Sequence, residues 1–519
     1  MPTRIPIIDL FAGPGGLGEG FSAFTPARMP GGGFTVRLSI EMDAVAHQTL
    51  LLRKFVRSFD SPPDDYFDYV AARLTREDLF ARHPVQFNAA SQQAWQAELG
   101  RKNQGAVTKR INTALNGAPV WALIGGPPCQ AYSLVGRSRM QSRTNPGFES
   151  DHRHFLYREY LRIVARHRPP VFLMENVKGL LSATHGGQKI FHRILSDLHE
   201  PGRALKMHGR TRLRYRLYPV GQTSQRSLIA GADFIPDPDS LVVRSEDFGI
   251  PQARHRVFVL GIREDLEVRP GLLQRSNPLH VEDVIDDLPR IRSTLSREDD
   301  SLETWRAAVD EVRNQPWFRS TQHPDLRAAA GVARAALDAI ASSSLGPGHA
   351  WLPHSGRPRR LSTWYRADCR GISNHEARGH MRSDLHRYLF AACYARAHGR
   401  SPTLEDFPAE LMPDHRNAER GRQGGMFSDR FRVQLPDHPS TTVTSHISKD
   451  GHYFIHPDPT QCRSLTVREA ARLQTFPDSY HFEGPRTEQY HQVGNAVPPL
   501  LAKQIAAIVY DVLQRLPGI

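Results

Sequence analysis

Cysteine is scarce in this sequence, and its scarcity speaks against two kinds of cross-linked fold. Only four cysteines occur in 519 residues, and they stand far apart, at Cys129, Cys369, Cys393 and Cys462. Without a Cys-x-x-Cys pair or a Cys/His ligand spacing, the pattern favours neither a disulfide framework nor a structural zinc site. Cys129 is therefore interpreted as a free thiol.

Long hydrophobic runs are missing as well. No segment approaches the roughly 18 consecutive apolar residues of a membrane-spanning helix, and we find no internal repeat. The N-terminus reaches an acid and a glycine cluster, in DLFAGPGG, too early for a signal peptide. We expect a cytoplasmic protein without a membrane partner.

Length and positive charge are what the sequence does have. A chain of 519 residues with 39% hydrophobic content suggests two or three domains. Lys and Arg (67) outnumber Asp and Glu (54), which gives a net charge of +13. This excess favours a polyanionic partner such as nucleic acid or an anionic membrane surface, and the alternative is a basic surface that serves only solubility.

Short apolar runs alternate with amphipathic stretches between Ile5 and Arg263. The runs are IPIIDLF, VRLSIEM, PVWALIGG, PPVFLMEN and HRVFVLGI, and FLYREYLRIVARH is typical of the stretches between them. The alternation predicts an α/β fold in which helices cover a parallel sheet. Ligands bind at the carboxyl ends of such strands, so we expect the functional site there.

A glycine cluster follows the first predicted strand. In DLFAGPGGLGEGF, Gly13, Gly15 and Gly18 fit Gly-x-Gly-x-x-Gly, which allows a tight turn and lets a ligand approach the backbone. Glu41, at the end of the second strand, is suited to bind ribose hydroxyls. Together they predict an adenosine-containing cofactor, either a dinucleotide or S-adenosylmethionine. The alternative is an ordinary glycine-rich turn.

Cys129 stands on a stiff turn. Pro127 and Pro128 precede it and each fixes φ, and a nucleophilic thiol benefits from a rigid backbone. Glu175 ends another strand of the predicted sheet and is followed by Asn176, in position to act as an acid near the thiol. The alternatives are that Cys129 is a buried hydrophobe and Glu175 a helix cap.

Two arginines, Arg254 and Arg256, stand at the start of the predicted strand HRVFVLGI. Residues two apart in a strand point to the same side, so both guanidinium groups can face one anion or base edge. The alternative is a solvated pair at the edge of the sheet.

The composition and the hydrophobic periodicity of the sequence change after Glu264. Residues 265–455 are rich in Arg, His, Ser and Pro and have weak periodicity, which predicts a second, irregular domain. Order returns where Thr466 and Glu469 form a capping box, and a helix is expected to end before Pro477. A last helix, apolar on one face over residues 501–516, is expected to pack back on the sheet.

Six segments occur in the order that they have in the DNA (cytosine-5) methyltransferase family, which the chain resembles. They are DLFAGPGGLGEGF, GGPPCQAYS, MENVKGLL, FGIPQARHRVFVLG, RSLTVREAARLQTFPDSY and QVGNAVPPLLA. The Pro-Pro-Cys-Gln turn and the Gln-x-Arg-x-Arg element are specific, whereas the glycine loop alone is not. The resemblance implies a Rossmann-like, S-adenosylmethionine-dependent methyltransferase sheet with helices on both faces, plus a smaller target recognition domain.

The resemblance also implies a mechanism. The Cys129 thiolate would add to C6 of cytosine while Glu175 protonates or hydrogen-bonds N3, so that C5 becomes nucleophilic and takes the methyl group. Because C6 is inaccessible in a stacked duplex, the target base must swing out. Arg256, with Arg254, would hold the extruded cytosine and its phosphate.

Cofactor contacts follow from the same resemblance. Phe11, Gly13, Gly15 and Glu41 match positions around the adenosine and methionine, while Pro128 and Asn495 would close the pocket. The stretch LVGRSRMQSRTNPGFESDHR after the thiol is expected to be a lid with hinges at Gly136 and Gly147, and the alternative is a disordered basic loop.

One position departs from the family pattern. The family usually has an aspartate and an apolar residue at the third strand to hold the adenine amino group, but the comparable stretch YVAARLTRED has Arg73-Leu74. That contact is left to Asp78, to the backbone, or to a different placement of the third strand.

We therefore predict three parts: a catalytic and cofactor-binding domain (1–264), a target recognition domain (265–455) and a segment that returns to the catalytic domain (456–519). The predicted function is methylation of cytosine C5 in a specific double-stranded DNA sequence, in the cytoplasm at the nucleoid, together with a restriction, phage-defence or epigenetic system. The alternatives are methylation of tRNA cytosine by the same fold, a catalytically silent DNA-binding relative, and an NAD-type oxidoreductase.

Overall fold

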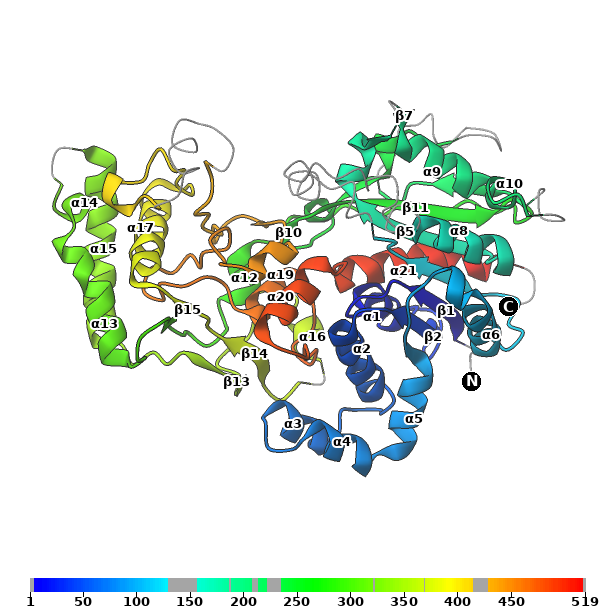
Figure 1. Ribbon diagram of the computed structural model, residues 1–519, viewed down its shortest axis with the longest axis horizontal. Coiled ribbons are helices and arrows are strands. Elements are labelled where there is room, and N and C mark those ends of the chain that lie inside the picture. Colours follow the sequence, from blue (N-terminus) through cyan, green and yellow to red (C-terminus); the bar gives the residue numbers. More distant parts are fainter. Residues whose placement is uncertain are drawn as a thin grey trace. The chain divides into compact units, whose positions relative to one another are not determined.

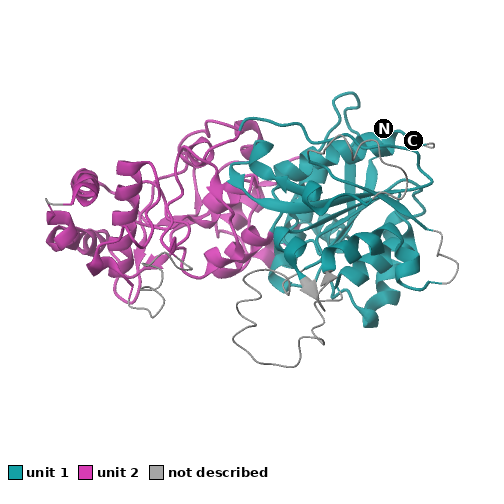
Figure 2. Ribbon diagram, turned by 90° about the horizontal axis from the view of Figure 1, so that it is seen from above, with its two compact units in different colours: residues 1–59, 83–277, 496–519 teal, residues 60–82, 278–495 magenta. Residues whose placement is uncertain are grey.

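The computed structural model divides the chain into two compact units. It describes residues 4–128, 156–185, 188–207, 213–221, 235–320, 323–367, 369–413 and 428–516. Unit 1 comprises Met1–Phe59, His83–Asn277 and Ala496–Ile519, and unit 2 comprises Asp60–Arg82 and Pro278–Asn495 (Figure 2).

An eight-stranded sheet forms the middle of unit 1 (Figure 1). The order across the sheet is β3-β2-β1-β4-β5-β11-β8, with β9 paired to β11. Strands β3, β2, β1, β4 and β5 pair parallel with one another. The strands are β1 (Ile5–Leu10), β2 (Phe34–Glu41), β3 (Ala94–Gln96), β4 (Ala122–Gly125), β5 (Val171–Val177), β8 (Tyr215–Tyr218), β9 (Val242–Arg244) and β11 (His255–Arg263).

The direction of β11 corrects the prediction of a parallel sheet. This strand runs antiparallel to β5, β8 and β9. Its residues Val257, Phe258, Val259 and Leu260 are all buried. The apolar run therefore predicts a strand that is covered on both faces, but it does not predict whether the strand runs parallel or antiparallel to its neighbours. The direction follows from the short connection between β9 and β11, residues 245–254, which contains no crossover helix.

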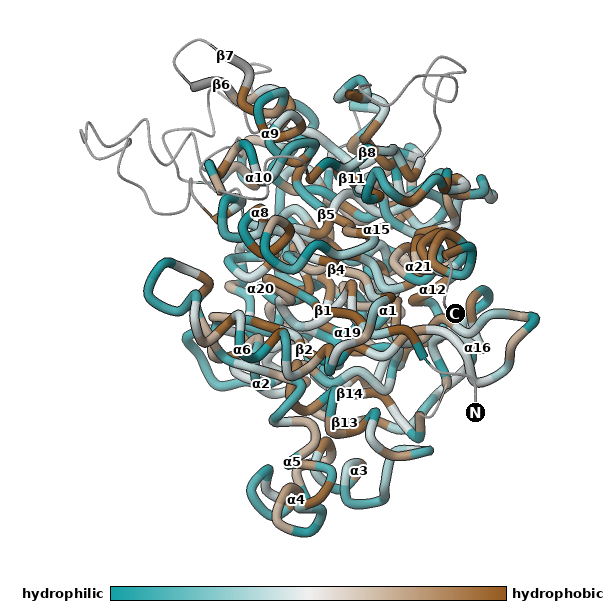
Figure 3. The backbone as a smooth tube through the Cα atoms, turned by 90° about the vertical axis from the view of Figure 1, so that its right-hand side faces the viewer, coloured by the Kyte–Doolittle hydropathy of each residue, from teal (hydrophilic) through white to brown (hydrophobic). Residues whose placement is uncertain are grey.

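Helices cover both faces of the sheet, as predicted. On one face, α1 (Gly16–Ser22) and α21 (Pro499–Gln514) share a core with Ile7 and Leu173. On the other face, α6 (Gln104–Leu115), α8 (Leu156–His167) and α9 (Ile190–His199) share a core with Ile8 and Phe172. Adjacent residues of a strand enter different cores because strand side chains alternate. Figure 3 shows the apolar character of β1 and α21.

Both helices predicted near the C-terminus are confirmed. Helix α19 (Val467–Leu473) has Thr466 as its N-cap and a capping box with Glu469, and it ends before Pro477. Helix α21 buries the predicted face against the sheet core. Residues Arg486–Gln514 are long and apolar enough to cross a membrane by composition, but 72% of the most apolar window is buried inside the protein, as in a core helix.

Unit 2 contains a helical core and a small two-stranded sheet. The helices α13 (Leu302–Asp310), α14 (Pro316–Arg319), α15 (Pro324–Ser342) and α17 (Arg382–His398) bury an apolar cluster that includes Trp305 and Phe390. Strands β13 (Gly348–Leu352) and β14 (Ile372–Glu376) pair antiparallel. Unit 2 also contains α3 (Asp64–Val70), α4 (Arg76–Arg82) and α20 (Arg486–Asn495), and unit 1 also contains α2 (Ala44–Val56) and α5 (Pro84–Gln93).

A layer of buried arginines joins distant segments of unit 2. Arg472 on α19 binds Asp478 through two hydrogen bonds of 2.7 and 2.8 Å and also binds Asp287. Arg463 binds Glu469 at 2.6 and 2.7 Å. Because each guanidinium meets carboxylates or carbonyls, these charges are buried with partners.

The unit boundaries differ from the predicted domain limits. The main segment of unit 2 begins at Pro278 and includes residues 456–495, which were predicted to return to the catalytic domain. Unit 2 also includes Asp60–Arg82, from the N-terminal part of the chain. Tyr66 on α3 explains the last difference, since its hydroxyl donates to the Ser479 carbonyl at 2.8 Å. A contact between residues 413 positions apart has no signal in local sequence pattern. The assignment of target recognition to 265–455 stays a prediction.

Candidate functional site

The loop after β1 has positive φ angles at two glycine positions. Gly13 has φ +56° and Gly15, the N-cap of α1, has φ +103°, a region that glycine adopts without strain. A Cβ on Gly13 would meet no atom within 4 Å, so open space borders the loop there. Phe11 also has a positive φ, +54°, which marks this turn as a constrained one.

Glu41 comes from the end of β2 and holds the same loop. Its Oε2 accepts a hydrogen bond from the Gly13 N–H at 2.7 Å, and its Oε1 accepts one from the Asp43 N–H at 2.8 Å. Burial raises the pKa of Glu41, while these two N–H groups act in the opposite direction. The structure therefore brings together Phe11, Gly13, Gly15 and Glu41.

Behind the loop, α1 packs closely on α21. A Cβ on Gly16 would lie 2.3 Å from the Val497 carbonyl oxygen, and one on Gly20 would lie 2.4 Å from the Ala502 Cβ. Asn495, two residues before Val497, is exposed at the end of α20 and belongs by its contacts to unit 2. Its expected place at the cofactor stays a prediction.

Glu175 and Arg256 form an ion pair across two neighbouring strands. Arg256 Nε lies 3.3 Å from Glu175 Oε1, and both side chains are largely buried. The antiparallel register places Arg256 beside Val177 and Phe258 beside Glu175, which aims the guanidinium at the carboxylate. Burial raises the pKa of Glu175, and the charges of Arg256 and Arg254 oppose that increase.

The turn that leads to Cys129 is attached beside this pair. Asn176 Nδ2 donates to the Pro127 carbonyl at 3.0 Å. A Cβ on Gly126 would lie 2.8 Å from Glu175 Oε2, so the turn passes directly against the carboxylate. Pro128 is half-buried and is the last described residue of the turn. Cys129 and the lid predicted at 134–153 lie outside the described residues.

Arg254 is held differently from Arg256. Its side chain is only 2% exposed, and its carbonyl accepts hydrogen bonds from the backbone and side chain of Ser245. Burial lowers the pKa of Arg254 well below the usual value, the nearby Arg256 adds to this, and Glu175 opposes it. Both arginines thus act electrostatically on Glu175, and Arg256 makes the direct ion pair.

Comparison with known proteins identifies the family. The family model for C-5 cytosine-specific DNA methylases matches residues 84–234 and 237–510. The type II methyltransferase M.Bpa9945I of Bacillus paralicheniformis is 32% identical over 98% of this chain and 99% of its own. M.AgeI of Thalassovita gelatinovora is 26% identical over 97% and 98%. The DNA (cytosine-5-)-methyltransferase M.ApeKI of Aeropyrum pernix is 28% identical over 78% and 84%.

The chain belongs to the C-5 cytosine-specific DNA methylase family. It is a DNA (cytosine-5-)-methyltransferase, which bears out the resemblance seen in its motifs. The alternatives of a silent DNA-binding relative and of a nicotinamide-dependent oxidoreductase have no support from these matches.

Residues 69–78 of this methyltransferase do not form the third strand of its sheet, which corrects one placement. The third strand is Ala94–Gln96, and the stretch instead ends α3 and begins α4 in unit 2. Tyr66, Phe67 and Val70 are buried at helical spacing. Arg73-Leu74 is therefore not the counterpart of the adenine-binding pair.

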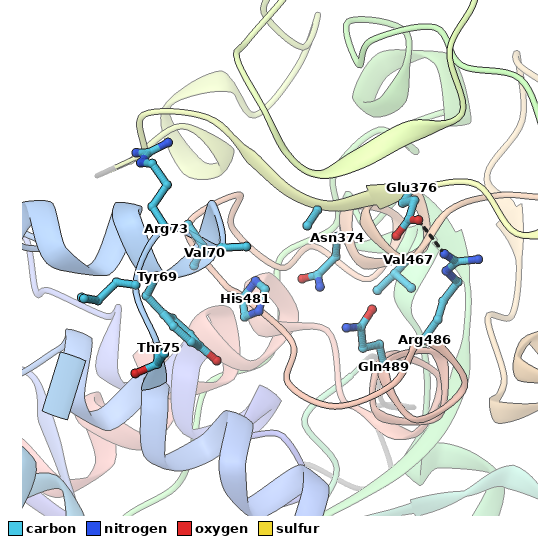
Figure 4. Close-up of a pocket in the computed structure, with 13 residues that line it drawn as sticks. Tyr69, Val70, Arg73, Thr75, Asn374, Glu376, Val467, His481, Arg486 and Gln489 are labelled. Carbon is cyan, nitrogen blue, oxygen red and sulfur yellow. Dashed lines mark ion pairs between the residues drawn. The ribbon is translucent and has the colours of Figure 1, made fainter. Parts of the chain in front are cut away.

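The same stretch lines a cavity of about 440 Å³ in unit 2 (Figure 4). The rings of Tyr69 and His481 meet edge to face there, with centroids 5.9 Å apart, and Arg486 binds Glu376 at 3.0 Å. Burial lowers the pKa of His481 to about 3, so its imidazole is neutral. None of the predicted site residues lines this cavity.

Two polar residues near the predicted sites were not assigned a role from the sequence. Asn176 was noticed only as the neighbour of Glu175, although its amide anchors the turn before Cys129. Asp9, buried in β1, was not singled out at all. Its signal was available: a charged residue in the apolar run IPIIDL has no partner nearby in sequence, and such a residue needs an explanation.

Proposed function

We propose that this methyltransferase transfers a methyl group from S-adenosylmethionine to C5 of an extruded cytosine, with Cys129 as the nucleophile and Glu175 as the acid. One observation supports this assignment above the others. The hydrogen bond from Asn176 to Pro127 attaches the turn that continues into Cys129 beside Glu175. A thiol and a carboxyl group that flank one pyrimidine ring are the pair that addition to C6 needs.

The Cys129 thiolate forms a bond to C6, and the electron pair displaced from the C5–C6 double bond is stabilised because Glu175 protonates or hydrogen-bonds N3. C5 then takes the methyl group, which S-adenosylmethionine supplies as an electrophile. Removal of the C5 proton by a base restores the double bond and expels the thiolate, while a proton donated to N3 returns to Glu175, which regenerates the enzyme.

The raised pKa of Glu175 suits this role. Burial favours the protonated form, and Arg256, with Nε 3.3 Å from Oε1, holds the carboxyl group in one orientation. A carboxyl group that keeps its proton nearer neutrality is a better donor to N3 than an exposed one. Arg254, buried beside the pair, would help to hold the extruded base and its phosphate.

The glycine loop suits the cofactor. Gly13 borders open space and its N–H is already directed to Glu41, so an adenosine ribose can be bound at this strand end. Phe11, Gly13, Gly15 and Glu41 would hold the adenosine and methionine portions, and Pro128 and Asn495 would complete the pocket.

The DNA substrate must be opened before this chemistry. Extrusion of one base costs a few kcal/mol, which contacts to phosphates and grooves offset. We assign sequence recognition to residues 265–455 and place the enzyme in the cytoplasm, at the nucleoid. Its relatives are named as type II methyltransferases, which supports a role beside a restriction or phage-defence nuclease.

Purified protein with a radiolabelled methyl donor tests the proposal. Label is expected in plasmid DNA at cytosine C5 and not in tRNA. DNA with 5-fluorocytosine at the target is expected to stay covalently attached to the protein, because fluorine cannot leave C5 as a proton does. Label in tRNA alone would overturn the choice of substrate, and methylation without adduct would overturn the covalent route.

Cys129→Ser is the decisive variant, and Cys369→Ser is its matched control. Cys129→Ser is expected to lose both methyl transfer and the adduct while DNA and cofactor still bind. Cys369 lies in unit 2 with its Sγ 2.6 Å from the Gly371 carbonyl, a contact that serine can keep, so its variant is expected to work normally. Normal turnover in Cys129→Ser would remove the nucleophile assignment.

A further inference from the structure

A buried carboxylate lies against the start of α1. Asp9, the fifth residue of β1, is 0% exposed, and neither of its oxygens has a well-formed hydrogen bond. A Cβ on Gly18 would lie 2.9 Å from Asp9 Oδ2, so glycine at this position lets the helix pass over the carboxylate. Such a group is costly to ionise unless a positive charge is near.

The charges that face Asp9 come from three elements. Lys54 on α2 favours its ionised form, Glu41 on β2 disfavours it, and Tyr160 on α8 also faces it. Burial raises the pKa of Asp9 to about 7, the largest of these effects. Lys54 gives incomplete compensation, since burial lowers the pKa of Lys54 itself to about 8 and its Nζ donates to the Val36 carbonyl at 3.3 Å.

Arg53 in α2 and Arg57, the C-cap residue of α2, already have a carboxylate partner. Arg53 and Arg57 both bind Glu19 on α1, with N–O distances of 2.6 to 2.9 Å. Neither forms an ion pair with Asp9 among the described contacts. Among the described cations, Lys54 therefore supplies the compensating charge for Asp9, and a further cation at the adjoining loop would favour the ionised carboxylate.

The loop connects Asp9 to the cofactor. Glu41, which faces Asp9, also holds the Gly13 N–H at 2.7 Å. S-adenosylmethionine carries a positive sulfonium, whereas its product after methyl transfer is a neutral thioether. A positive ligand at this loop favours ionised Asp9, and by linkage ionised Asp9 favours the positive ligand.

We propose that Asp9 is a specificity-determining residue, whose ionised carboxylate favours the charged methyl donor over the neutral thioether product. This inference rests on the proposed use of S-adenosylmethionine. Asp9 acts through space on ligand charge, while Glu41 and the loop backbone bind the parts that donor and product share. The product is then released more readily because the charge that Asp9 stabilises has been consumed in the transfer.

Calorimetric titration of the full-length protein with S-adenosylmethionine and with S-adenosylhomocysteine, at pH 6, 7 and 8, tests the inference. If only the ionised form favours the donor, donor affinity is expected to rise up to about tenfold from pH 6 to pH 8. Affinity for the product is expected to change less. Asp9→Asn is expected to flatten the donor profile until it parallels that of the product.

Asp43→Asn is the matched control. Asp43 is exposed, lies two residues after Glu41, and caps α2, a role that asparagine also fills, so the pH profile is expected to persist. Equal profiles for donor and product in the wild type would overturn the inference, even if Asp9→Asn fails to fold. Tight donor binding with a flat profile would do so while leaving the proposed function intact. Absence of donor binding would instead remove the proposed cofactor.

Discussion

Among the residues, Glu175 has the most closely defined task in the proposed chemistry, because its carboxyl group must supply a proton or a hydrogen bond to N3. Its ion pair with Arg256 and its burial act in opposite directions on its pKa, and burial is the larger effect. The pair also fixes geometry, because Arg256 reaches Glu175 from a strand whose register is set by seven antiparallel residue pairs.

Glu175→Gln is expected to reduce methyl transfer by about 10²-fold or more, the usual contribution of a positioned acid. Single-turnover rates measured from pH 6 to pH 9 check it. In the wild type, transfer is expected to fall as pH rises through the raised pKa of Glu175, because the proton donor is lost. The variant is expected to lose that alkaline decline. If the rate of the variant still falls at alkaline pH, the titrating proton donor is a group other than Glu175.

Asn176→Ala removes the hydrogen bond that anchors Pro127. The expected result is a fall of about tenfold in the rate of transfer, because a small misplacement of a reacting group is costly. Cofactor affinity, which depends on the loop near Glu41, is expected to stay unchanged, and calorimetry measures it. A large loss of cofactor affinity with normal turnover would contradict this view of Asn176.

At the scale of elements, α1 packs against α21 and against the residues just before it, and glycine at positions 16 and 20 allows the close approach. Gly16→Ala would bring a Cβ to 2.3 Å from the Val497 carbonyl. It is expected to lower the free energy of unfolding by about 1–3 kcal/mol, as overpacking does. Chemical denaturation measures the change.

Gly105→Ala is the control for that substitution. Gly105 lies in α6, and a Cβ there meets no atom within 4 Å. Alanine favours the helix over glycine by up to about 1 kcal/mol, so stability is expected to stay equal or increase. Equal stability of the two variants would show that α1 and α21 tolerate separation.

The buried arginines of unit 2 hold several segments together, and the hydrophobic pattern of the sequence does not predict their burial. Arg472→Met would remove the guanidinium that hydrogen-bonds both Asp478 and Asp287, whose side chains are buried, and would leave Arg366 as a neighbouring cation of both. Removal of one partner of such a pair costs about 3–5 kcal/mol. Arg515→Met, in an exposed pair with Asp511, is expected to cost about 0.5 kcal/mol or less. Similar thermal shifts for both variants would contradict the account.

At the scale of the whole molecule, the net charge of +13 bears on the encounter with DNA. Binding is expected to weaken linearly on a logarithmic scale of salt concentration, with a slope set by the number of phosphates neutralised. Fluorescence anisotropy with a labelled duplex between 50 and 300 mM salt measures the slope. A duplex affinity that does not respond to salt would remove the electrostatic argument.

The sequence by itself determined the enzyme family and most of the sheet. The turns and strand ends that contain Gly13, Glu41, Pro127 and Glu175 could be predicted because they leave local signals, and the roles of these residues stay predictions. The helix after Thr466 and the apolar face of α21 were likewise encoded within a few turns.

Only the tertiary structure decided what depends on distant partners. Strand β11 is antiparallel because its connection is short, Tyr66 carries residues 60–82 into unit 2 through a contact with Ser479, and the role of Asn176 required the position of Pro127. Asp9 is the sharpest case, since the cost of its charge depends on how many groups exclude water from it. The local sequence pattern specifies which surface of an element is buried. The residues against which that surface packs are specified only by the three-dimensional structure.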